Sequence, residues 1–109
     1  MSEKLLVREA KRRAEVFRNL PKYLKLIHDI ILRLDKNAEI YLFGSVAEGR
    51  NLLSSDIDIL VVTSLSPQKI LAELWKAGIK DPFEIHVVNR ETFEAYKKRA
   101  KLVPIAEYP

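Results

Sequence analysis

The chain has 109 residues, of which 31% are charged and 48% are hydrophobic, and it contains no cysteine. This length allows one domain with one core, and the composition is that of a folded globular protein rather than a disordered one. The lack of cysteine excludes disulfides and thiolate metal sites, and it favours a reducing, cytoplasmic location. No apolar run approaches the length of a membrane span, so we expect no membrane partner.

The formal net charge of +4 is concentrated towards the N-terminus. Residues 1–36 contain ten Lys or Arg against five Asp or Glu, whereas the remaining residues contain nine against ten. A basic surface of this kind suits nucleic acid or an acidic partner. The simpler interpretation is a solvated helix face, which is the usual origin of a run of charges.

Two helices are expected first. Residues 3–20 predict a helix with a mixed surface, in which apolar residues alternate with many basic ones, and Pro21 either begins a second helix or breaks the first. The second helix is better defined, because its apolar residues fall on one stripe with helical periodicity. The members of that stripe are Tyr23, Leu24, Ile27, Ile30, Ile31 and Leu34.

Two strands with a tight turn between them follow. Residues 39–43 predict a short strand that ends at Gly44 and Ser45. Ser45 followed by Glu48 matches a capping box, so we expect a short helix to start there. Residues 56–63 predict the second strand, and the continuous Ile, Leu and Val after Asp58 indicate that both of its faces are covered.

The last part of the chain predicts a helix, a third strand and a final helix. Ser66 and Pro67 begin the first of these helices, which stops at Gly78. Residues 83–88 predict the strand, and Asn89 caps the last helix. The resulting order, ααβαβαβα, predicts a small α/β sheet flanked by helices.

Aromatic residues and the C-terminal tail complete these expectations. We assign Trp75, Tyr41 and Phe43 to core packing rather than to the stacking of bases. Tyr108 and the tail after Pro104 are expected to be peripheral.

Two aspartates at the start of the second strand carry the chemical signal. Asp56 and Asp58 are two positions apart, so on a strand they project from the same face, about 6.5–7 Å apart along the chain. Their oxygens can converge on one divalent cation or on two. Gly44 and Ser45 offer a tight turn, free amides and a hydroxyl, which suit a phosphate tail. The combination predicts phosphoryl or nucleotidyl chemistry.

A specific resemblance follows from these residues. Gly44-Ser45, ten intervening residues, Asp56-Ile57-Asp58 and a later acidic strand resemble the DNA polymerase β-like nucleotidyltransferase superfamily. Within it the chain is similar to the minimal nucleotidyltransferases of archaea and bacteria, which are often paired with a HEPN protein. The resemblance covers residues from about 23 to 100. It implies an α/β (α+β) fold with a small mixed sheet flanked by helices and with an N-terminal helical extension.

The resemblance also implies one nucleotidyltransferase domain, 1–109, with N-terminal helices at 1–36 and a catalytic core at 37–109. Asp56 and Asp58 would be catalytic and would hold two Mg²⁺ ions, a cation that takes one or two carboxylates together with substrate phosphates. Gly44 would allow close approach of the nucleotide, and Ser45 would bind its β and γ phosphates.

Four positions depart from the family pattern or extend it. Glu84 is the candidate for the third catalytic and metal-binding carboxylate, at a place where the family often has Asp. His86 lies on the same face of the third strand, and it is either an auxiliary group or proton acceptor, or a surface histidine. Many relatives have Arg where this chain has Glu48, so Arg50 is the candidate for binding the triphosphate.

The leading functional hypothesis is an Mg²⁺-dependent enzyme that transfers a nucleoside monophosphate, AMP from ATP, to an acceptor hydroxyl. The resemblance implies that the acceptor belongs to a HEPN-type protein in a toxin–antitoxin pair. One alternative is a catalytically silent antitoxin-like module that retains the fold and nucleotide binding. Modification of nucleic-acid ends is the other, supported only by the basic helices, and association of the chain with itself stays open.

Overall fold

The computed structural model describes residues 3–50 and 55–108. It is a mixed α+β domain in which helices flank a four-stranded sheet, which confirms the predicted fold class. The elements, in chain order, are α1 (Glu3–Arg18), α2 (Leu20–Leu34), β1 (Glu39–Phe43), α3 (Gly44–Ala47), β2 (Ile57–Val62), α4 (Pro67–Lys76), β3 (Phe83–Val88), α5 (Arg90–Arg99), β4 (Val103–Pro104) and the 3₁₀ turn η1 (Ile105–Glu107).

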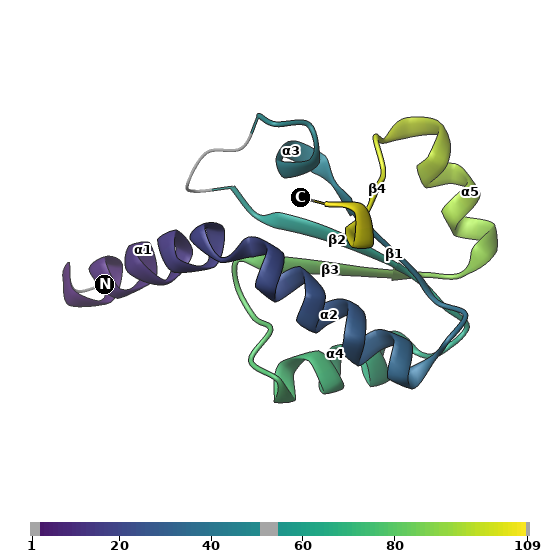
Figure 1. The fold of residues 1–109 in the computed structure, drawn as a ribbon, viewed down its shortest axis with the longest axis horizontal. Helices are drawn as coiled ribbons and strands as arrows, with labels where there is room; N and C mark the ends of the chain where they lie inside the picture. The colour runs from purple at the N-terminus through teal and green to yellow at the C-terminus, as the bar shows by residue number, and fades with distance from the viewer. Residues whose placement is uncertain (1–2, 51–54, 109) are drawn as a thin grey trace.

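The sheet has the strand order β3-β2-β1-β4. The two strands β2 and β3 run parallel, and the pairs β1–β2 and β1–β4 are antiparallel. In Figure 1, α2 and α4 lie on one side of the sheet, while α3 and α5 lie on the other. The parallel strands β2 and β3 both begin near the C-terminal end of α1.

The central strand β2 is covered on both faces, as predicted. Ile57, Ile59 and Val61 are buried in the larger apolar cluster, together with residues of α2 and α4. Leu60 and Val62 point the other way and form a smaller buried cluster with Phe93 of α5. The exception in β2 is Asp58, which is only partly buried. Strand alternation thus directs one polar side chain out of an otherwise apolar strand.

The two N-terminal helices have very different environments. The stripe expected on α2 is confirmed, with Leu24, Ile27 and Ile31 fully or almost fully buried. In α1 the buried side chain is Val16, near the C-terminal end of that helix, and Figure 1 shows α1 extending away from the body of the fold. Within the described part of the chain, no helix combines the length and the apolar composition that a membrane crossing requires.

The predicted capping box at Ser45 and Glu48 is wrong. The helix α3 begins at Gly44, and its N-cap residue is Phe43, with no hydrogen bond from a side chain. Gly44 has φ of +76°, a left-handed conformation that glycine adopts without strain, and this turn leads directly from β1 into α3. Ser45 is therefore inside the first turn, and the carboxylate of Glu48 pairs with Arg50 at 3.3 Å.

Two further expectations fail, while Tyr41 and Phe43 do pack against the smaller cluster as predicted. Trp75 is not a core residue: it is 62% exposed, because α4 directs Ile70 and Leu74 to the sheet and turns Trp75 away. The C-terminal tail is not peripheral, because β4 pairs with β1 and Ile105 is buried in the larger cluster. A two-residue strand that includes a proline leaves too short a pattern to be recognised in sequence.

Candidate active site

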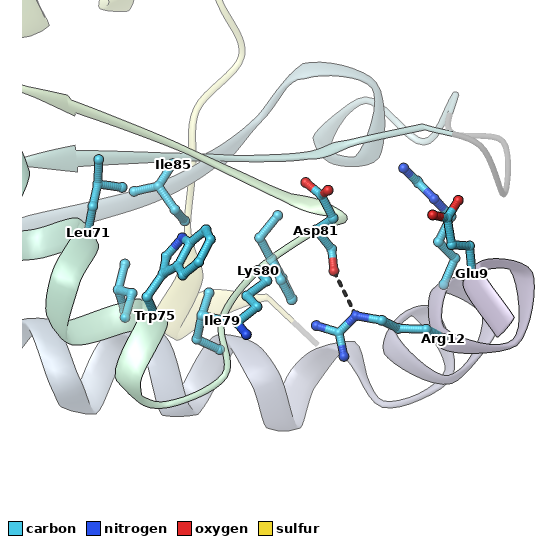
Figure 2. A pocket seen from close by; sticks show the side chains of 11 residues that line it. Glu9, Arg12, Leu71, Trp75, Ile79, Lys80, Asp81 and Ile85 are labelled. Carbon is cyan, nitrogen blue, oxygen red and sulfur yellow. Dashed lines mark hydrogen bonds between the residues drawn. The ribbon is translucent and has the colours of Figure 1, made fainter. Parts of the chain in front are cut away.

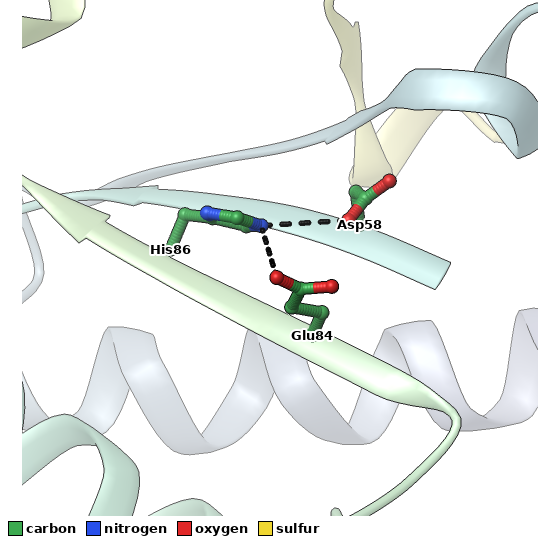
Figure 3. Close-up of side chains that lie close together, drawn as sticks. All are labelled: Asp58, Glu84 and His86. Carbon is green, nitrogen blue, oxygen red and sulfur yellow. Dashed lines mark hydrogen bonds and ion pairs between the residues drawn. The ribbon is translucent and has the colours of Figure 1, made fainter. Parts of the chain in front are cut away.

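The site is built by two neighbouring parallel strands. Asp58 pairs in register with Glu84, and Leu60 pairs with His86. Because side chains alternate along a strand, Asp58 of β2 and both Glu84 and His86 of β3 project from the same face of the sheet. Figure 3 shows the three side chains converging on one another.

The distances within this Asp58–Glu84–His86 group are short. The Nε2 atom of His86 lies 3.4 Å from Oδ1 of Asp58 and 3.6 Å from Oε1 of Glu84. One donor atom from each residue can be chosen so that all lie within 4.8 Å of one another. The side chains are 24% exposed for Asp58, 30% for His86 and 54% for Glu84, so the group opens to solvent on the side of Glu84.

The group fits a divalent cation. Two carboxylates on adjacent strands are the hard oxygen donors that Mg²⁺ prefers, and an imidazole is a common ligand for the softer divalent metals. Ligands of one such ion stand about 2.0–2.2 Å from it, so donors up to 4.8 Å apart need only small side-chain rotations to share it. Sequence alone left the role of His86 open, and the structure directs its Nε2 atom towards an oxygen of each carboxylate.

Gly44 follows β1 and lies next to Asp58, on the side of the site away from β3. A Cβ atom added at Gly44 would collide with the carboxylate of Asp58, with its Cγ only 3.2 Å away. The residue before it, Phe43, pairs with Asp58 in the sheet and places its ring edge-on against His86, with 5.1 Å between ring centroids. The structure therefore brings Gly44 against the acidic group.

Asp56 is not part of the group. It precedes β2, its side chain is 52% exposed, and its Oδ1 lies 3.6 Å from Nη2 of Arg13 on α1. The same guanidinium donates from Nη1 to the carbonyl oxygen of Ser55 at 3.1 Å. Sequence reasoning missed Arg13, because it is one of several basic residues on α1 and no local pattern connects it with a site so distant in the chain.

Ser45 and Arg50 lie on the segment that follows Gly44. Ser45 is in the first turn of α3, and its carbonyl oxygen accepts a hydrogen bond from the backbone N–H of Arg50 at 2.9 Å. The guanidinium of Arg50 is paired with Glu48 and is 66% exposed. The described contacts thus connect Arg50 with Glu48 rather than with the acidic group, and the next residues, 51–54, lie outside the described part of the chain.

A second polar network lies at the other end of β1. Glu39 accepts hydrogen bonds from Arg90 and from the hydroxyl of Tyr41, and these bonds lower the pKa of its carboxyl group. Burial, followed by the hydrogen bond to Glu39, raises the pKa of Tyr41 to about 12. Arg90 and Tyr41 both contact the ring of Phe93, so this network joins α5 to the sheet.

The nucleotidyltransferase domain family matches residues 24–105, which include every strand and the whole acidic group. The chain belongs to this family, and its class is that of the nucleotidyltransferases, as the motif predicted. The matched region begins within α2 and leaves α1 outside.

Individual relatives agree with this class. A crystal structure of a presumed nucleotidyltransferase shares 27% identity, with a TM-score of 0.58, over 72% of this chain and 95% of that one. A second, from Sulfolobus solfataricus, shares 26% identity, with a TM-score of 0.53, over 83% of this chain and 84% of that one. Among curated proteins, the chain is 31% identical over 78 residues to the inactive non-canonical poly(A) RNA polymerase protein Trf4-2 of Drosophila melanogaster. That match takes in 68% of this chain but only 19% of the fly protein.

Proposed function

We propose that the chain transfers a nucleoside monophosphate, AMP from ATP, to an acceptor hydroxyl in a reaction that requires Mg²⁺. The observation that carries this proposal is the convergence of Asp58, Glu84 and His86 beside Gly44 on a nucleotidyltransferase fold. Oxygen donors that face a turn without a side chain suit a metal–triphosphate complex.

The roles of the carboxylates follow from their positions. Asp58 and Glu84 would hold the cation that binds the nucleotide. Asp56, together with these two carboxylates, would bind a second cation. Bound Mg²⁺ would orient the triphosphate and lower the pKa of the attacking hydroxyl. A carboxylate oxygen of Glu84 that the cation leaves free would accept the proton of that hydroxyl as its oxygen bonds to the α-phosphorus and pyrophosphate leaves.

The turn after β1 would bind the phosphates. Gly44 leaves room for the carboxylate of Asp58, which any larger residue would displace, and its backbone without a side chain would allow the triphosphate to approach closely. We assign Ser45 to the β and γ phosphates, and Arg50 to the charge of the triphosphate after it exchanges Glu48 for the nucleotide. An exposed ion pair of this kind is weak, so the exchange requires little free energy.

The acceptor we propose is a hydroxyl of a HEPN-type protein, in a toxin–antitoxin pair within the cytoplasm. The resemblance to minimal nucleotidyltransferases supports this. We also propose that the one domain, 1–109, consists of N-terminal helices at 1–36 and a catalytic core at 37–109. The basic surface of the N-terminal helices would receive the partner. Self-association would be an alternative way to complete the site.

A second candidate function is a catalytically silent module that retains nucleotide binding. The observation in its favour is that a curated relative is named as inactive. Transfer of label from [α-³²P]ATP to a copurified partner would distinguish the two functions. The silent module predicts binding of ATP without transfer.

The proposal is tested by calorimetric titration of ATP, with Mg²⁺ and with chelator, into wild-type protein and the Asp58→Asn variant. Asp29→Asn is the matched control, because it removes an exposed carboxylate on α2 that pairs with Lys25. We expect Mg²⁺-dependent binding in the wild type and in the control, and a loss of at least tenfold in Asp58→Asn. Equal binding by all three proteins would contradict the assignment of Asp58.

A further inference from the structure

Two adjacent arginines of α1 reach the starts of both site strands. Arg12 donates from Nε to the carbonyl oxygen of Asp81 at 3.0 Å, in the turn before β3, as Figure 2 shows. Arg13 donates from Nη1 to the carbonyl oxygen of Ser55 at 3.1 Å, just before β2. The C-terminal part of α1 therefore joins the two segments from which Asp58 and Glu84 emerge.

Of these two arginines, Arg13 also meets a carboxylate assigned to the site. Its Nη2 atom lies 3.6 Å from Oδ1 of Asp56, and its side chain is only 27% exposed. The corresponding bonds of Arg12, to Asp81 and at 3.5 Å to Gly78, go to backbone carbonyl oxygens. Arg12 and Arg13 thus differ in one respect that concerns the site: Arg13 contacts the side chain of Asp56, and Arg12 does not.

We propose that Arg13 regulates the loading of metal by holding Asp56. The first divalent cation would bind the Asp58–Glu84–His86 group, which Arg13 does not contact. The second would need Asp56, and a guanidinium beside that carboxylate competes with a cation for the same oxygens. Metal loading is then ordered, and the contact of α1 with Asp56 sets the affinity of the second step. This inference rests on the proposed function, because it assumes that Asp56 takes part in metal binding.

The expected size of the effect follows from exposure. Asp56 is half exposed and the ion pair is loose, so solvent screens much of the interaction. An effect of about fivefold on the second dissociation constant corresponds to about 1 kcal/mol, the upper range for exposed pairs. The first dissociation constant should not change, since its ligands project from the strands beyond Asp56.

The test is a titration of the full chain with Mn²⁺, in which the electron paramagnetic resonance signal reports the free ion. The variants are Arg13→Gln, which removes the charge, and Arg13→Lys, which keeps it. Arg12→Gln is the matched control, because it removes the neighbouring anchor without touching Asp56. We expect Arg13→Gln to tighten the weaker Mn²⁺ step about fivefold, and Arg13→Lys and Arg12→Gln to stay within twofold of the wild type.

Three results would overturn the inference. If Arg13→Gln left both steps unchanged or weakened either, Arg13 would not compete with the metal. If Arg12→Gln tightened the second step equally, the cause would be the docking of α1 rather than the charge of Arg13. If neither the wild type nor Arg13→Gln bound Mn²⁺, the proposed function would fail with it, whereas one intact tight step that Asp58→Asn abolishes would leave the proposed function standing.

Discussion

The two faces of the sheet perform different tasks with the same strands. On the face covered by α2 and α4, β2 places Ile57, Ile59 and Val61 in the larger apolar cluster, each with no exposed surface. On the opposite face, Leu60 and Val62 form the smaller buried cluster with Phe93, while Asp58 is only partly buried. On this face β2 therefore has two buried apolar side chains and one partly exposed carboxylate, whereas its other face is entirely apolar.

The difference arises from where the helices lie. Phe93 of α5 packs near Leu60, Val62 and Val88, towards the C-terminal ends of β2 and β3. The N-terminal ends of these strands on this face are left to α3 and to the polar side chains of the site. On the face that carries the acidic group, α5 thus covers the C-terminal ends of β2 and β3, and the acidic group lies at the ends that α5 leaves uncovered.

The largest expected effect is a difference in stability between substitutions at two adjacent residues of β2 that point to opposite faces of the sheet. Ile59→Ala should lower the free energy of unfolding by about 3 kcal/mol, because it leaves a cavity in the larger cluster. Asp58→Asn should change that free energy by less than about 1 kcal/mol, since this side chain is partly exposed and has no apolar packing to lose. Urea denaturation measures both. A cost at Asp58 equal to that at Ile59 would show that the faces are not distinct in stability.

The next effect concerns the turn that faces Asp58. Gly44→Ala should weaken Mn²⁺ binding at least tenfold, because its Cβ must displace the Asp58 carboxylate. Gly49→Ala is the control: Gly49 has nearly the same φ, +72° against +76°, but nothing lies within 4 Å of an added Cβ. Both variants should lose about 1 kcal/mol of stability from backbone strain, and only Gly44→Ala should lose metal affinity. Equal Mn²⁺ affinity in the two variants would contradict the close approach.

A smaller effect depends on pH and concerns the network that joins α5 to the sheet. Because bonds from Arg90 and Tyr41 lower the pKa of Glu39, its ionised form stabilises the fold at neutral pH. That contribution is lost as the pH falls from about 4.5 through the lowered value. Glu39→Gln should therefore cost about 0.5 kcal/mol at pH 7, a figure kept small by solvent screening, and nothing at a pH low enough to protonate this carboxyl group in the folded protein.

Thermal melts at both pH values would measure this difference. Glu73→Gln is the control, because its carboxylate pairs with Lys76 at 3.2 Å on α4, on the other side of the sheet from α5. A Glu39→Gln cost that was independent of pH would mean that the carboxylate acts by packing and not by its charge.

The smallest effect is expected at Trp75, on the outside of the helix that covers the apolar face. Since Trp75 is 62% exposed, Trp75→Ala should change the free energy of unfolding by less than about 0.5 kcal/mol. Leu74→Ala, one residue earlier and fully buried, should cost about 3 kcal/mol. A large loss of unfolding free energy in Trp75→Ala would contradict its exposed position and would support the core position predicted from the sequence.

The sequence predicted those features that depend on local pattern. Alternation in residues 57–62 and the spacing from Gly44 to Asp58 identified the strand, its polar position and the family. The register that pairs Asp58 with Glu84 could not be predicted, because parallel pairing is decided by packing across the whole sheet. The contact of Arg13 with Asp56 was equally inaccessible, since an arginine on a basic helix carries no local sign of its partner. The prediction of Ser45 as a helix N-cap was wrong, because the turn at Gly44 starts α3 one residue earlier than the capping-box pattern indicates.

The central claim is that Asp58, Glu84 and His86 hold a divalent cation, and NMR with substoichiometric Mn²⁺ tests it most directly. The paramagnetic ion should broaden the ring signals of His86 and the amide signals of Asp58 and Glu84 first. Leu71 on α4, on the other side of the sheet, should keep its signal at the same Mn²⁺ level. Asp58→Asn should restore the His86 signals. If His86 stayed sharp while other regions broadened, or if the Asn variant behaved as the wild type, the acidic group would not be the metal site.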